Sequence, residues 1–140
     1  MTPARWLVDS SVLSRLHVSE VAETILPMVG AGLVGVSIVT ELEMGFTARS
    51  TTDYRTSRAS LLDHLLPVYL PMRAEDRARE VQSSLVERGQ HRSAGAADLL
   101  VAATAEIEGL TLWHYDADFD LIGNVTGQVT EWVVPRGSVA

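Results

Sequence analysis

Cysteine and lysine are both absent from this chain of 140 residues. Without cysteine there are no disulfides, no zinc–thiolate sites and no thiol nucleophiles. Without lysine there is no Walker phosphate-binding loop, no Schiff-base chemistry and no serine–lysine dyad. All 11 basic residues are therefore arginine. The lack of cysteine is compatible with the cytoplasm, which is the location we expect.

Long apolar runs and a signal-peptide pattern are lacking too. The longest apolar stretch, residues 25–39, is interrupted by a proline and by glycines. It is shorter than the roughly 20 residues that a membrane helix needs. Residues 1–6 are not followed by the apolar segment that a signal peptide requires. These features predict a soluble, intracellular protein.

Positive charge is scarce, and the formal net charge is −7 at pH 7. This charge argues against a protein that coats nucleic acid by bulk electrostatics. It is still compatible with a nucleic-acid enzyme whose acids are concentrated in a metal site and whose arginines line the approach. The length and the 46% of hydrophobic residues fit one domain, residues 1–140, that folds without a disulfide or metal staple.

Short apolar runs alternate with segments of helical periodicity along the whole chain. Strands are predicted at 6–8, 33–36, 67–70, 111–115 and 131–134. Helices are predicted after Ser10 or Ser11, at 19–29, after Ser37, and at 51–66, 74–88 and 96–107. Because no hairpin signals join the strands, the pattern predicts an α/β fold. We expect a single α/β/α domain, with a central parallel sheet of four to five strands and helices on both faces.

Four acidic residues stand directly after an apolar run or in the first turn of a predicted helix: Asp9, Glu41, Asp98 and Asp116. Ligands of an open parallel sheet bind outside the carboxyl ends of its strands, so these carboxylates should gather at one edge. Their mutual repulsion would be relieved by a hard divalent cation, Mg²⁺ or Mn²⁺. Such a cluster can activate water and stabilise the leaving oxygen of a phosphodiester, which favours a metal-dependent enzyme.

Each of these acids could instead cap a helix or complement its dipole. The same alternative, capping or metal binding, applies to Asp118 in the first turn after Asp116. Glu43 lies two positions from Glu41 and hence on another helix face, so we expect it at the surface.

Arginines and histidines near these acids give weaker signals. Arg15, soon after Asp9, and Arg92, in the loop before Asp98, are candidate phosphate contacts or ordinary surface charges. His114 falls within a predicted strand, where side chains point to alternate faces, and we favour a structural role for it over a chemical one.

Four segments carry a resemblance to a known family: Leu7–Val12, Ser37–Leu42, Ala97–Ala105 and His114–Phe119. Their series closely resembles PIN-domain ribonucleases, and within them the VapC toxins of bacterial toxin–antitoxin pairs. The resemblance covers nearly the whole chain in order and length.

The resemblance implies an Mg²⁺- or Mn²⁺-dependent endoribonuclease that cuts structured RNA such as tRNA or rRNA. In PIN domains the positions that match the four acids bind metal and position the attacking water, and the position of Asp118 contributes in some members. Ser10 matches a small hydroxyl position that supports the site, so it joins Arg15 and Arg92 as a candidate substrate-binding residue. The resemblance also implies a homodimer and a small VapB-like antitoxin whose tail enters the acidic groove.

Other functions are weighed against this one. A PIN nuclease outside a toxin–antitoxin pair differs only in context, and an antitoxin-like reading frame immediately upstream would separate the two. A non-catalytic PIN binding domain would be expected to lack one of the acids. A phosphoacceptor receiver domain needs a lysine and an aspartate after its central strand. Here lysine is absent, and the third predicted strand is followed by Pro71, Met72 and Arg73.

Overall fold

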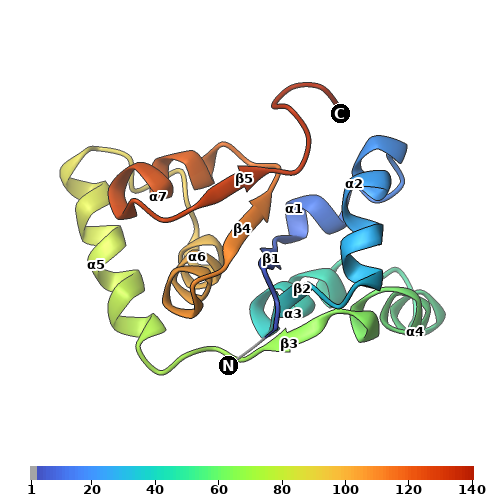
Figure 1. The fold of residues 1–140 in the computed structure, drawn as a ribbon. Helices are drawn as coiled ribbons and strands as arrows, with labels where there is room; N and C mark the ends of the chain where they lie inside the picture. The colour runs from blue at the N-terminus through green and yellow to red at the C-terminus, as the bar shows by residue number, and fades with distance from the viewer. Residues whose placement is uncertain (1–2) are drawn as a thin grey trace.

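One parallel sheet of five strands organises the computed structural model, which describes residues 3–140 (Figure 1). The strands are β1 (Trp6–Val8), β2 (Val34–Ser37), β3 (Leu66–Val68), β4 (Thr111–His114) and β5 (Thr130–Trp132). Their order across the sheet is β3-β2-β1-β4-β5, and each neighbouring pair is parallel. The predicted fold is confirmed, with five strands. Met1 and Thr2, part of the N-terminal segment interpreted above, lie outside the described residues.

Helices connect the strands and cover both faces of the sheet. They are α1 (Ser10–Leu13), α2 (Ser19–Gly30), α3 (Ile38–Phe46), α4 (Thr51–Ser60), the 3₁₀ turn η1 (Leu62–His64), α5 (Ala74–Glu87), α6 (Ala96–Glu108) and α7 (Asp118–Thr126). In Figure 1, α5, α6 and α7 lie on one side of the strands and α1, α2 and α4 on the other. Within residues 3–140, none of these helices has the length and apolar character that a membrane span requires.

Two hydrophobic cores result from the alternation of side chains along the strands. Leu7 of β1 and Leu112 of β4 face α5, α6 and α7, where Val101 and Phe119 are fully buried. The neighbouring residue Val8 faces the opposite side, toward α1 and α2. Strands that are buried on both faces in this way explain why the sequence reads as short continuous apolar runs.

The structure differs from the predicted elements in two places. The helix predicted over 51–66 ends at Ser60, because Leu61 adopts φ −135° and ψ −67°, outside the helical region. Leu66 already belongs to β3 and pairs with Gly35 of β2. Helix α7 (Asp118–Thr126), in contrast, was not predicted.

The carboxyl ends of β1, β2 and β4 meet at one edge of the sheet, and this edge positions the site. Asp9 follows β1 directly and caps α1. Ser37 ends β2 and caps α3, its hydroxyl oxygen accepting a hydrogen bond from Val39 N at 3.2 Å. After β4, Tyr115 and Asp116 lead into α7. The edge thus carries side chains that are more than a hundred residues apart in sequence.

Candidate active site

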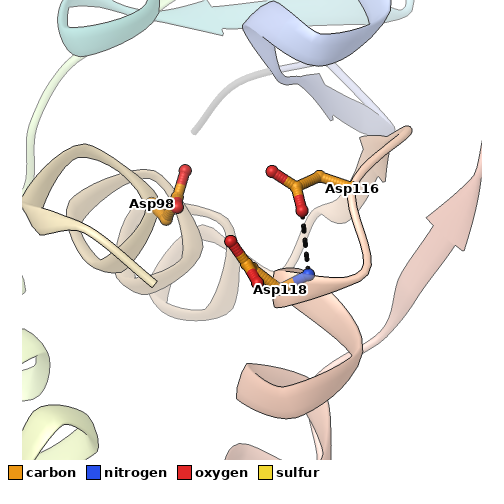
Figure 2. A group of neighbouring side chains, drawn as sticks. All are labelled: Asp98, Asp116 and Asp118. Atoms are coloured by element: carbon orange, nitrogen blue, oxygen red, sulfur yellow. Dashed lines mark hydrogen bonds between the residues drawn. The ribbon is translucent and has the colours of Figure 1, made fainter. Parts of the chain in front are cut away.

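Three aspartates converge at this edge (Figure 2): Asp98 from the first turn of α6, Asp116 after β4, and Asp118 at the start of α7. One carboxylate oxygen from each lies within 4.8 Å of the other two. Figure 2 shows the three carboxyl groups around a common space, and the backbone N–H of Asp118 donates to Asp116 Oδ1 at 2.9 Å. That hydrogen bond fixes the orientation of the Asp116 carboxylate relative to α7.

Asp98 is held by the entry of α6. The backbone N–H of Gly95 donates to Asp98 Oδ2 at 3.2 Å, which ties the carboxylate to the residue that precedes the helix. Burial raises the pKa of Asp98 to about 6. The hydrogen bond from Gly95 opposes the rise, whereas the negative charges of Asp9, Asp116 and Asp118 add to it. Ionisation of Asp98 at neutral pH is therefore costly unless positive charge is supplied.

Asp9 is buried beside this cluster, with 3% of its surface exposed. Its backbone N–H donates to Trp113 O at 2.9 Å, and its Oδ2 accepts from Ser11 N at 2.9 Å. Burial raises the pKa of Asp9; hydrogen bonds from Ser11 and Ser10 oppose the rise, and the charge of Asp116 contributes to it. Burial and the Asp116 charge also raise the pKa of Asp118.

A cavity of about 690 Å³ opens onto these groups. One part of its lining is acidic, formed by Asp9, Glu43, Asp98 and Asp116 beside the hydroxyl of Ser10. The other part is apolar and comes from α3, with Val39, Leu42, Met44 and Phe46. The cavity therefore combines a pole of negative charge with an apolar wall.

The structure does not bring Glu41 to the cavity that Asp9, Asp98 and Asp116 line. Glu41 Oε1 pairs with Arg58 of α4 at 2.9 Å, and its side chain lines a separate depression next to β3. Glu43, which was expected at the surface, lines the cavity instead. Helical geometry explains the exchange, because residues two positions apart point about 200° apart around the helix. The spacing to Val39 was the sequence signal for Glu43. Val39 lies four residues earlier, hence on the same helix face, and it also lines the cavity.

Glu43 also shares the electrostatics of the cluster. Burial raises its pKa, the charge of Asp9 adds to the rise, and a hydrogen bond with Ser10 opposes it. Asp9, Glu43 and Ser10 therefore act on one another across the cavity.

The three predicted substrate contacts are placed differently from one another. Ser10 lines the cavity. Arg92 is exposed in the loop before α6. Arg15 is already engaged by the protein: it donates to Ser11 O at 2.7 Å and to Ala140 O at 3.1 Å.

His114 braces the loop that carries Asp116. It is fully buried between Phe119 and Trp132, and its Nδ1 accepts a hydrogen bond from Asp116 N at 3.2 Å. Burial lowers the pKa of His114. Its Nε2 has no hydrogen-bond partner among the described residues.

The donor set suits a divalent cation. Carboxylate oxygens are the ligands that Mg²⁺ and Mn²⁺ prefer, and three carboxylates lie close enough to share one ion. The raised pKa values of Asp9, Asp98 and Asp118 reflect burial and mutual repulsion, both of which a bound cation would offset. Residues Asp98, Asp116 and Asp118 could hold the ion, with Asp9 beside them.

Known proteins share both the sequence and the fold. A family model of the PIN domain matches residues 6–125. The chain is 46% identical over 137 residues to ribonuclease VapC2 of Mycobacterium tuberculosis (strain CDC 1551 / Oshkosh), covering 97% of each protein. It is 40% identical over 134 residues to ribonuclease VapC21 of Mycobacterium tuberculosis (strain ATCC 25618 / H37Rv), covering 96% of this chain and 97% of the relative.

Two solved structures have a similar fold at low sequence identity. One is VapBC2 from Rickettsia felis bound to a DNA fragment from their promoter, with a TM-score of 0.76 and 15% identity over 91% of this chain and 98% of that one. The other is DNA-bound VapBC from Salmonella typhimurium, with a TM-score of 0.74 and 15% identity over 94% and 99% of the two chains. At these identities the likeness concerns the fold alone.

Proposed function

Because this chain belongs to the PIN domain family and, within it, to the VapC ribonucleases, we propose that it is a metal-dependent endoribonuclease. It acts as the toxin of a VapBC-type toxin–antitoxin pair. Its substrates are structured RNAs such as tRNA or rRNA, which also makes the cytoplasm its place of action. The observation that carries this proposal is the convergence of Asp98, Asp116 and Asp118 on one space, at a cavity that Asp9 and Glu43 also line.

Three aspartates supply the direct ligands in this proposal. Asp98, Asp116 and Asp118 hold Mg²⁺ or Mn²⁺ through their carboxylate oxygens, and Asp9 adds negative charge from its buried position. When bound, such an ion lowers the pKa of water and offsets the charge that develops on the phosphodiester. Burial and mutual repulsion disfavour the charged forms of Asp98 and Asp118 and raise their pKa values, and a bound cation would offset both effects.

Glu43 and Ser10 orient the attacking water. Glu43 lies on the α3 side of the cavity, and its raised pKa makes its carboxylate a better proton acceptor than an ordinary glutamate. Ser10 lines the same cavity and lowers the pKa of Glu43, which favours the carboxylate form. Glu43 therefore takes the role that the sequence interpretation gave to Glu41.

Arg92 is the remaining candidate for a contact with the RNA backbone. It is exposed in the loop that leads into α6, whose first turn carries Asp98. A guanidinium group there can offset phosphate charge and steer RNA toward an otherwise acidic cavity.

The cavity also suits a segment of the cognate antitoxin. An arginine from that segment would pair with the carboxylates, and its apolar residues would cover Val39 and Met44. Such a tail would compete with metal and RNA for the same groups, which supports inhibition by occupation of the site.

A second apolar surface supports a homodimer. Ile38 of α3, Tyr69 and Leu70 line one depression, and their exposed fractions are 45%, 82% and 40%. Met72, close by in sequence, is 95% exposed. Adjacent large apolar side chains at the surface mark an interaction site, and a second copy of the chain is the partner we propose for it.

The test of the activity uses purified, metal-stripped protein with end-labelled tRNA and rRNA. We expect cleavage when Mg²⁺ or Mn²⁺ is added, none with chelator, and a loss of at least about 100-fold for Asp98→Asn, as expected when a group that sets up the catalytic ion is removed. Cleavage by Asp98→Asn at the wild-type rate, or equal cleavage with chelator, would overturn the proposal.

A further inference from the structure

We infer that the last residues of the chain, 133–140, form a strap that positions the metal-binding loop through Tyr115. The inference rests on the proposed function, because it assigns a task to the strap within the same site. It concerns residues that touch neither metal nor RNA.

Reciprocal hydrogen bonds join the strap to Tyr115. The hydroxyl group of Tyr115 donates to Val139 O at 2.9 Å and accepts from Val139 N at 3.2 Å. The chain turns back after β5 and ends near α1 (Figure 1). Val133 and Val134 anchor the strap in the core that contains Val12 of α1. The strap therefore packs against the domain, and near its end it is hydrogen-bonded to Tyr115.

Tyr115 is also tied to the opposite side of the site. Its backbone N–H donates to Ser11 Oγ at 2.9 Å, and Ser11 N donates to Asp9 Oδ2 at 2.9 Å. A continuous series of contacts thus runs from Val139 through Tyr115 and Ser11 to the buried carboxylate of Asp9.

Arg15 contacts Tyr115, Ser11 and the end of the strap together. Its guanidinium carbon lies 4.7 Å from the centre of the Tyr115 ring. The same group donates to Ser11 O and to Ala140 O at 2.7 and 3.1 Å. A single side chain therefore joins α1, Tyr115 and the end of the strap, and these contacts occupy the guanidinium that was predicted to meet phosphate.

These contacts affect the metal site because of where Tyr115 lies in the chain. Tyr115 directly precedes Asp116, whose carboxylate also orients Asp118 N. A shift of Tyr115 would move Asp116 relative to Asp98, which is fixed separately by Gly95 on α6. Tyr115, Arg15 and Val139 are therefore positioning residues, because they set the geometry of the ligands without joining them.

The test compares Mn²⁺ affinities of metal-stripped full-length proteins by electron paramagnetic resonance, without RNA. Tyr115→Phe removes the hydroxyl and keeps the ring, and Val139→Pro removes the N–H that the hydroxyl accepts. Each should weaken Mn²⁺ binding by about 10-fold, the lower range for groups that orient metal ligands. The double variant should lose little more than Tyr115→Phe alone, because the N–H that Val139→Pro removes donates to the hydroxyl that Tyr115→Phe already removes.

Tyr54→Phe is the matched control, since Tyr54 is 43% exposed and lies on α4, away from the strap. It should keep the wild-type affinity. Thermal unfolding of each protein separates positioning from general stability. A lower Tm with unchanged Mn²⁺ affinity in both Tyr115→Phe and Val139→Pro would overturn the inference, and so would additive losses of affinity in the double variant. Failure of the wild-type protein to bind Mn²⁺ would instead count against the proposed function.

Discussion

Glu41 and Glu43 lie two positions apart on α3 and serve different surfaces. Glu43 lines the cavity with Asp9 and Asp98, whereas Glu41 accepts a hydrogen bond from Arg58 at 2.9 Å. Arg58 also reaches Asp63 at 3.3 Å, so the pair attaches α4 and η1 to α3. One glutamate thus belongs to the proposed chemistry and the other to the attachment of the next helix.

Substitution of these two glutamates should separate their roles. Glu43→Gln should lower RNA cleavage by about 100-fold, within the range for loss of a general base. Glu41→Gln should leave cleavage near the wild-type rate and lower the free energy of unfolding by about 1 kcal/mol or less, as for a partly exposed ion pair. Single-turnover cleavage and urea denaturation of both variants measure this. The assignment fails if Glu41→Gln is the variant that loses activity.

The stability of the metal-free protein should depend on pH through Asp98. Its pKa is about 6 in the folded protein and close to the usual 3.8 in the unfolded chain. The folded state therefore holds an extra proton between these values, and its stability falls as the pH rises from about 4 to about 6. Above that range the loss is complete.

Asp98→Asn is the control for this pH dependence, because its side chain carries no charge. With chelator present, its Tm relative to wild type should rise between pH 4 and 6 and stay level above pH 7. Added Mn²⁺ should stabilise only the wild-type protein. A Tm difference that does not change with pH would argue against the raised pKa of Asp98.

The close approach of β2 and β3 depends on Gly35. A Cβ atom at this position would lie 2.5 Å from Val68 Cγ2 and 3.3 Å from Ala4 Cβ. Gly35→Ala should therefore destabilise the fold by about 1–3 kcal/mol through overpacking. Gly30→Ala, at the end of α2 with nothing within 4 Å of the new Cβ, should be neutral or slightly stabilising. Denaturant midpoints of both variants decide this, and equal midpoints would contradict it.

Dimerisation through the surface next to β3 can be tested by introducing a negative charge there. Met72→Glu places a carboxylate on a side chain that is 95% exposed, so the folded monomer should tolerate it. Two such charges would face a desolvated apolar interface, and the measured mass should shift from dimer toward monomer. Val129→Glu, at an exposed position before β5, is the control. A wild-type protein that is monomeric by light scattering would remove this part of the proposal.

The sequence was informative where local pattern decides the structure. Asp9 and Asp116 follow short apolar runs, and Asp98 opens a helix of small residues, so their common edge could be inferred from a parallel sheet. The rotation of α3 about its axis, relative to the sheet, decides which of its two glutamates faces the cavity. Local spacing in the sequence does not define that rotation.

Helix α7 and the strap were missed for other physical reasons. Residue 117 provides no capping side chain for α7, and Gly123 and Asn124 have low helix propensity in its interior. The contact between Tyr115 and Val139 spans 24 residues, and that between Arg15 and Ala140 spans 125. Such pairs carry no local periodicity.

The most direct test of a single carboxylate metal centre is an anomalous difference map from crystals of the protein grown with Mn²⁺. The proposed site predicts a peak among the carboxylates of Asp98, Asp116 and Asp118, on the side of the cavity that Asp9 and Glu43 also line. The Asp98→Asn variant should show no peak there. A saturated Mn²⁺ site elsewhere on the protein, with none between these three aspartates, would contradict the account.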